Sequence, residues 1–247
     1  MKYRHIFLLM LVAVSTLLFS FYQKQKDNTL SPKEKKEGWQ LLFDGKTLKG
    51  WKMYKNKSAD CWAAKNGELY CKGSETDKSD LRSDIMTVET FQDFELTIQW
   101  KISKAGNSGI MYHVTEEFDA PYLSGPEYQL IDDVGFPEKL EDWQKTGSDY
   151  AMYNAVSRPT KPVGEYNVSR IVVKGAHREY WLNGIKVVEF EAWTPDWYKR
   201  KTEGKWKDAP GYGIAKKGAI CLQDHGSGVW FKNIKLRKLE VPLSEHL

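Results

Sequence analysis

Every second residue from Phe94 to Ile102 is apolar, and the residues between them are polar. A period of two predicts a β-strand with one buried side and one side that faces solvent. Comparable runs predict strands over Tyr166–Lys174, Arg178–Leu182 and Ile185–Glu191. The last two flank Asn183-Gly184, a pair typical of type I′ turns, so we expect them to form a hairpin.

Only two stretches have the features of helices, Pro137–Gln144 and Pro195–Lys205. Thr194 is a suitable N-cap for the second, and Pro195 suits the first helical position. Both interrupt a chain of short strands separated by Gly, Asn and Asp, so we expect them to shape a rim rather than form a layer. The pattern predicts an all-β fold, a two-sheet antiparallel sandwich over residues 39–240.

The N-terminus predicts export. Lys2, Arg4 and His5 precede an uncharged apolar stretch over Ile6–Phe21, which is the layout of a secretory signal. We predict a signal peptide over residues 1–22, with an uncleaved membrane anchor as the alternative, and a periplasmic or cell-envelope location. Residues 23–38 are rich in Lys, Ser, Pro and Glu without an apolar period, so we predict a disordered linker there.

Charge and cysteine content narrow the class of protein. The net charge is only +4, and the excess of Lys lies in two polar stretches, so no basic stripe predicts binding to nucleic acid. Of three cysteines, Cys61 and Cys71 flank a hairpin turn at Asn66-Gly67. A three-residue loop would place them opposite each other and allow a disulfide, whereas a two-residue turn would place them on opposite faces. The sequence leaves both arrangements open.

Three predicted strands carry polar residues that a core does not need. In the strand Gly109–Val114, Met111 and His113 lie on the face opposite to Tyr112. The strand Glu127–Asp132 places Glu127 and Gln129 on one face. The strand Ala219–His225 places Cys221, Gln223 and His225 on one face. If these strands are neighbours in one concave sheet, their side chains converge on a patch suited to a polyhydroxylated ligand. Aromatic residues could contact the sugar ring, with candidates Trp181, Trp197, Tyr112 and Tyr122. The alternative is an ordinary solvated outer face.

Three other segments carry residues that could bind a ligand or a cation or take part in acid-base catalysis. Ala105–Gly109 is a glycine-bracketed turn that would let the backbone approach a ligand, and Asp224–Gly228 leaves a strand with an Asp-His pair that suits acid-base or metal chemistry. Asp132-Asp133 could bind a divalent cation such as calcium or magnesium at a strand end, although no EF-hand spacing is present. No nucleophile elbow, phosphate loop or dinucleotide motif occurs, which argues against serine-nucleophile, nucleotide and hydride chemistry.

Five segments, in order along the chain, resemble the motif set of the 3-keto-disaccharide hydrolase family: Leu42–Trp51, Gly106–Ile110, Gly125–Asp132, Trp181–Gly184 and Leu222–Gly226. The resemblance implies a concanavalin-like jelly roll and activity on glycosides that a separate sugar 3-dehydrogenase has oxidised at carbon 3. It implies a carbohydrate substrate and no certain cofactor, and it leaves a divalent cation open.

The resemblance also implies site residues. It places Glu127, Gln129, Gln223, Asp224 and His225 in the sugar groove. We predict that His225 or Glu127 is the base and the other the acid or a metal ligand, with Asp224 also in the catalytic set. The predicted substrate contacts are Asn107, Tyr112, His113, Gln129, Gln223 and Trp181, and Asp132 is the predicted metal ligand. Many members carry arginine at the position of His113, which suggests a role in substrate choice.

Two other functions compete with this one. A non-catalytic carbohydrate-binding module on the same fold would show the same polar patch, and fold alone does not separate the two. A retaining glycosidase needs two carboxylates on one strand face, and Gln129 stands where the second would fall. We therefore rank the glycosidase last.

Overall fold

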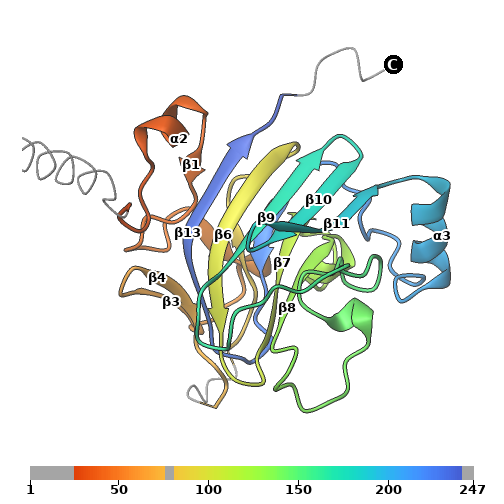
Figure 1. The fold of residues 1–247 in the computed structure, drawn as a ribbon, viewed down its shortest axis with the longest axis horizontal. Coiled ribbons are helices and arrows are strands. Elements are labelled where there is room, and N and C mark those ends of the chain that lie inside the picture. The colour runs from red at the N-terminus through yellow and green to blue at the C-terminus, as the bar shows by residue number, and fades with distance from the viewer. Residues whose placement is uncertain (1–24, 76–80, 241–247) are drawn as a thin grey trace, which may run out of the picture.

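The computed structural model describes residues 25–75 and 81–240, and the predicted signal segment over residues 1–22 lies outside this range. Two antiparallel sheets pack face to face (Figure 1). The larger sheet has eight strands in the order β11-β10-β9-β6-β13-β4-β3, with β1 paired to β13. Its strands are β1 (Gln40–Leu41), β3 (Trp62–Lys65), β4 (Glu68–Cys71), β6 (Phe94–Ile102), β9 (Asn167–Lys174), β10 (His177–Leu182), β11 (Ile185–Glu191) and β13 (Val229–Lys238).

The smaller sheet has five strands in the order β2-β5-β12-β7-β8. Its strands are β2 (Trp51–Met53), β5 (Ile85–Thr87), β7 (Asn107–Val114), β8 (Glu127–Ile131) and β12 (Ala219–Leu222). The three strands with unexplained polar residues are therefore adjacent, in the order β12-β7-β8. Sequence separation hid this order, because β12 follows β8 by almost ninety residues of chain and yet pairs with β7.

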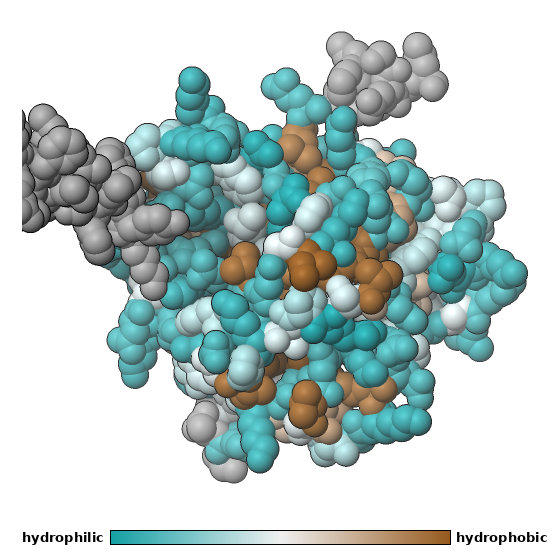
Figure 2. Space-filling model, viewed as in Figure 1, coloured by the Kyte–Doolittle hydropathy of each residue, from teal (hydrophilic) through white to brown (hydrophobic). Residues whose placement is uncertain are grey.

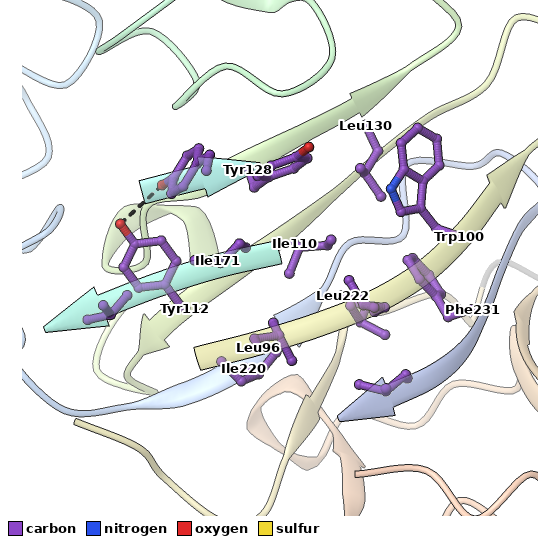
Figure 3. Close-up of a cluster of buried hydrophobic side chains, with 14 of the residues drawn as sticks. Leu96, Trp100, Ile110, Tyr112, Tyr128, Leu130, Ile171, Ile220, Leu222 and Phe231 are labelled. Atoms are coloured by element: carbon purple, nitrogen blue, oxygen red, sulfur yellow. Dashed lines mark hydrogen bonds between the residues drawn. The ribbon is translucent and has the colours of Figure 1, made fainter. Parts of the chain in front are cut away.

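The core lies between the sheets. Figure 3 shows Ile110, Leu130 and Leu222 of the smaller sheet on the side that faces Leu96 and Phe231 of the larger one. Phe94, Leu96, Ile98, Trp100 and Ile102 are all buried, which confirms the alternating strand predicted there. The hairpin at Asn183-Gly184 is also confirmed, with positive φ at both residues. The face of the molecule seen in Figure 2 is largely hydrophilic, with scattered small hydrophobic spots.

Helices are few and lie at the edges. Helix α3 (Pro195–Glu203) begins after Thr194, whose hydroxyl accepts a hydrogen bond from the Trp197 N–H, as predicted. The helix predicted over Pro137–Gln144 is wrong except for its end, where only the 3-10 turn η3 (Asp142–Gln144) forms. The other short helical segments are α2 (Pro32–Lys36), η1 (Tyr54–Asn56) and η2 (Pro121–Leu123). Across the described residues, no helix is both long and apolar enough to cross a bilayer.

The prediction of a disordered linker over residues 23–38 is wrong for the described part. Ser31 caps helix α2 through a capping box with Glu34. Asn28 exchanges hydrogen bonds with Asn233 of β13, and Lys235 of β13 pairs with Glu34 at 2.6 Å. Figure 1 shows α2 beside β1 at one end of the sandwich. Polar contacts to strand β13 order this segment without an apolar period.

The β3–β4 hairpin has the two-residue turn, because Lys65 pairs with Glu68. Cys61 and Cys71 nevertheless lie on one side as free thiols, and their Sγ atoms lie within 4.8 Å of each other. Cys61 precedes β3, so the alternation of the strand does not extend to it. The two-residue turn therefore does not place Cys61 and Cys71 on opposite faces, contrary to the expectation.

Candidate active site

A row of residues crosses the outer face of the smaller sheet. Gly109 of β7 pairs with Gln129 of β8 on one side. On its other side, the Gly109 carbonyl accepts a hydrogen bond of 2.9 Å from the Gln223 N–H, just beyond the end of β12. Because side chains at paired positions share a face, Gln223 and Gln129 stand on either side of a glycine. The missing side chain leaves a notch in the middle of the row.

The Glu127 side chain fills this notch. A Cβ atom built on Gly109 would lie 2.7 Å from Cδ of Glu127, and closer still to Oε1. Glu127 is only 4% exposed, and burial, assisted by the negative charge of Asp84, raises the pKa of its carboxyl to about 8. A carboxyl with a pKa near neutrality can both hold and release a proton in the pH range of most enzymes.

Amide groups surround this carboxyl. Gln129 is oriented by its neighbours, because its Nε2 donates to the Gln144 carbonyl at 3.0 Å and its Oε1 accepts from the Leu130 N–H. The Asn107 Oδ1 atom is buried and has no hydrogen-bond partner among residues 25–75 and 81–240. A buried acceptor without a donor costs about 1–3 kcal/mol, so a hydroxyl of a bound ligand would stabilise it.

Aromatic rings form the wall opposite the sheet. The segment over residues 147–150 runs beside β8, where the Tyr150 N–H donates to the Glu127 carbonyl at 3.0 Å. The Trp206 Nε1 donates to the Tyr150 carbonyl, and the Trp206 ring stacks on Tyr212 with 4.2 Å between centroids. Lys205 lies over the Tyr150 ring and donates to its hydroxyl. Tyr122 packs near Trp206, with 6.4 Å between the ring centroids.

These groups enclose a cavity of about 290 Å³, close to the lower limit for small-molecule sites. Its lining is Asn107, Tyr122, Glu127, Gln129, Tyr150, Lys205, Trp206, Gln223 and His225. A larger cavity of about 500 Å³ has a mixed lining that includes Trp100, Ile102, Ile131, Val163, Asp132, Asp133 and Asn167. We favour the smaller one because amides, an imidazole and a buried carboxyl converge in it.

Comparison with known proteins places the chain. Residues 38–237 match the 3-keto-alpha-glucoside-1,2-lyase-like domain. The chain belongs to this family.

Relatives of known structure or name agree with this assignment. A Bacteroides thetaiotaomicron protein named 3-keto-disaccharide hydrolase is 33% identical over an alignment length of 231 residues, and the match covers 83% of this chain and 79% of that protein. A solved structure from Parabacteroides distasonis, a candidate glycosyl hydrolase, is 43% identical with a TM-score of 0.81 and covers 87% of this chain and 100% of its own. A second one from the same organism is 25% identical, with a TM-score of 0.60 over 81% of this chain and 99% of its own. The glycosyl hydrolase-like jelly-roll fold is thereby confirmed.

The structure brings five of the predicted family site residues to one cavity and leaves the others outside it. Asn107, Glu127, Gln129, Gln223 and His225 line the cavity, the last from an exposed position at its rim. Tyr112 does not reach it. Tyr112 is fully buried between the sheets, and its hydroxyl meets that of Tyr180 at 3.1 Å, marked by the dashed line in Figure 3. The predicted substrate contact at Tyr112 is therefore wrong.

His113 and Trp181 are also misplaced by the sequence pattern. The register between β7 and β12 shifts by one residue, and His113 has a positive φ of 53°. This β-bulge turns the His113 side chain away from the polar face. Its Nε2 atom lies 2.7 Å from the Gln92 carbonyl oxygen, and its ring packs on Phe94. Trp181 belongs to β10 of the other sheet, under Arg170. Neither residue contacts the cavity.

Asp224 and Asp132 have structural partners instead of facing the cavity. The Asp224 carboxylate pairs with Arg82 at 2.6 Å and lies 3.5 Å from the Cys71 thiol. Asp132 Oδ2 accepts from the Ala105 N–H at 2.9 Å, and Oδ1 accepts from the Gly135 N–H at 2.8 Å. Asp132 therefore stabilises the loops that contain Ala105 and Gly135. Its role as a metal ligand stays a prediction.

Groups of three ligand-type residues occur elsewhere within residues 25–75 and 81–240. Cys61, Cys71 and Asp224 form one, and His177, Glu179 and Glu189 form another. In the first group, the Arg82 guanidinium already binds Cys71 and Asp224. Its positive charge therefore lies where a metal ion would lie. Neither group lines the cavity.

Of the predicted aromatic candidates, Tyr122 lines the cavity, but the sequence did not predict the other aromatic residues of its wall, Tyr150 and Trp206. Lys205 ends the predicted helix Pro195–Lys205 and Trp206 follows it directly, so a cation and an aromatic residue at this rim are a usable signal. Tyr150 gave no such signal, because it lies in an irregular segment that reaches Glu127 only through pairing beside β8.

Proposed function

We propose that this protein cleaves glycosides that carry a ketone at carbon 3, by elimination followed by hydration. A ketone at carbon 3 acidifies the hydrogen on carbon 2, so a base can remove it as a proton. The electron pair then forms the carbon 1–carbon 2 double bond while the bond from carbon 1 to the departing oxygen breaks. Addition of water across this double bond completes a net hydrolysis.

The observation that carries the proposal is a buried, protonatable Glu127 in a cavity that also holds His225 and three amides. Because the pKa of Glu127 is raised to about 8 by burial, it holds its proton at pH 7 and suits the acid that protonates the departing oxygen. His225 then serves as the base at carbon 2. The side-chain amides of Gln129 and Gln223 donate to the oxygen on carbon 3 as negative charge develops there.

The remaining groups suit a sugar. The Asn107 Oδ1 atom, which lacks a partner among the described residues, accepts from a sugar hydroxyl. The Tyr122 ring, which lines the cavity and is 42% exposed, offers a flat face to the C–H side of the sugar ring. The relative from Bacteroides thetaiotaomicron is named 3-keto-disaccharide hydrolase, and this name supports a carbohydrate substrate. A ketone at carbon 3 requires a prior oxidation of the glycoside, so a separate sugar 3-dehydrogenase would supply this substrate.

The test compares a 3-keto glucoside with its unoxidised parent, each with and without chelator. Release of the aglycone from the keto form alone is expected. Release from the parent would indicate an ordinary glycosidase, and binding without release would indicate a carbohydrate-binding module. Loss of activity with chelator that Mg²⁺ or Ca²⁺ restores would add a divalent cation to the site.

Two variants test the assigned roles. Glu127→Gln and His225→Asn should each reduce turnover about a hundredfold or more, since general acid and base groups contribute about 10²–10⁴-fold. Glu189→Gln, an exposed change on β11, is the matched control and should retain full activity. Full activity in either test variant would remove that residue from the mechanism.

A further inference from the structure

A second carboxyl group extends the row across the smaller sheet. Ile85 of β5 pairs with Leu222 of β12, so the preceding Asp84 stands beside Gln223. Ile85 is part of the core, and because side chains alternate along a strand, Asp84 points to the outer face. The row therefore runs from Asp84 through Gln223 and Gly109 to Gln129, with the Glu127 carboxyl in the notch.

Asp84 fixes the loop that carries His225. Its Oδ1 accepts a hydrogen bond of 2.8 Å from the Asp224 N–H. Two residues earlier, Arg82 donates to the Asp224 carboxylate at 2.6 Å, which in turn accepts from the Gly226 N–H at 3.0 Å. His225 therefore lies between Asp224, which Asp84 and Arg82 bind directly, and Gly226, which Asp224 binds. These bonds hold the backbone on both sides of the exposed His225.

The charges around Glu127 make Asp84 its principal anionic neighbour. Asp84 and Asp149 disfavour the charged form of Glu127, whereas Lys205 favours it, and the Cys221 thiol also lies near. Around Asp84 itself, Asp224 opposes ionisation and Lys57 supports it. Burial raises the pKa of Asp84 only to about 6, against about 8 for Glu127. At pH 7 these pKa values favour a charged Asp84 at one end of the row and a protonated Glu127 in the notch.

We infer that Asp84 is a positioning residue of the proposed reaction: its Oδ1 fixes the His225 loop through the Asp224 N–H, and its carboxylate lies in the same row as the Glu127 carboxyl. The inference rests on the proposed function for its kinetic meaning. The two parts of the role are separable, because an asparagine retains the acceptor oxygen and loses the charge.

The experiment measures the pH dependence of kcat/KM on a 3-keto glucoside for wild type, Asp84→Asn and Asp84→Ala. If Glu127 must be protonated, activity falls on the alkaline side as Glu127 ionises. Removal of the Asp84 charge lowers the pKa of Glu127, so Asp84→Asn should move this alkaline limb to lower pH by about half a unit or more, with a plateau within a few-fold of wild type. Asp84→Ala should show the same shift and lose a further tenfold or so in kcat.

Asp119→Asn is the matched control, because Asp119 is fully exposed and pairs with Lys55 at 3.6 Å, outside the cavity. Its profile should match wild type. A profile of Asp84→Asn that superimposes on wild type would overturn the inference and leave the proposed function standing. Absence of cleavage by wild type would overturn the proposed function instead.

A measurement without substrate keeps the inference testable on its own. The Glu127 carboxyl is followed by carbon-13 NMR as a function of pH in wild type and in Asp84→Asn, with thermal unfolding as a check of folding. Titration of Glu127 at lower pH in the variant supports the inference. An unchanged titration in a folded variant contradicts it.

Discussion

The Glu127 carboxyl group lies over Gly109, in the space that any larger residue at position 109 would need. A Cβ atom there would come within 2.8 Å of Cγ and 2.7 Å of Cδ of Glu127. The φ angle of Gly109 is not in the left-handed region, so the backbone would accept alanine. Gly109 is therefore required by the position of a side chain on the next strand.

Gly109→Ala should reduce kcat/KM on a 3-keto glucoside by about ten- to a hundredfold while the protein stays folded. The clash involves the far end of a flexible side chain, so Glu127 can rotate away at small cost in stability. A displacement of about 1 Å in a reacting group can lower the rate about a hundredfold. Steady-state kinetics and thermal unfolding on the same sample check both parts.

A double mutant shows whether the loss acts through Glu127. Gly109→Ala introduced into Glu127→Gln should add little further loss, because the group that the alanine displaces has already been disabled. Multiplication of the two losses would mean that Gly109 acts by another route.

Glu127→Gln should make the protein more stable at alkaline pH while it lowers activity. The unfolded chain ionises Glu127 near pH 4.5, but burial raises the pKa in the fold to about 8. Between these values the folded state binds more protons, so this contribution to stability is full below pH 4.5 and is lost as pH rises toward 8. Glutamine removes the buried charge, and the variant should gain several degrees in Tm over wild type at pH 9, where about 1 kcal/mol corresponds to about 2–4 °C. The gain should shrink at pH 5; an equal Tm for both proteins at pH 9 would contradict the burial argument.

Tyr122→Ala should raise KM by about three- to tenfold and leave kcat nearly unchanged. Tyr122 lines the cavity and is 42% exposed, so the change removes a ring face for the sugar with little loss of packing. Tyr198 on α3 is 44% exposed and lies outside the cavity, so Tyr198→Ala is a matched control. Equal KM values for the two variants would remove Tyr122 from the binding surface.

The sequence predicted those parts of the fold and site that depend on regular alternation. Glu127 and Gln129 lie on one face because β8 is a regular strand, and Gln223 follows directly from β12. Alternation failed at His113, since one extra residue in β7 turns every later side chain. It also could not find Asp84, which joins the site through pairing of β5 with β12 across more than a hundred residues of chain. Non-local pairing and bulges are set by tertiary packing, and a single sequence carries little trace of them.

His113→Gln should leave kcat/KM unchanged and weaken the acid sensitivity of the fold. Burial, with the positive charge of Arg178, lowers the pKa of His113 to about 4. The unfolded chain takes up this proton near pH 6.5, so between pH 6.5 and 4 the unfolded state binds more protons and stability falls as pH falls. Glu127 contributes in the opposite sense over part of this range, and it does so equally in both proteins. The difference in Tm between wild type and variant therefore isolates His113: wild type should lose more on going from pH 7 to pH 5. A parallel pH dependence in the two proteins would show that the imidazole is not held neutral, and a raised KM would return His113 to the sugar site.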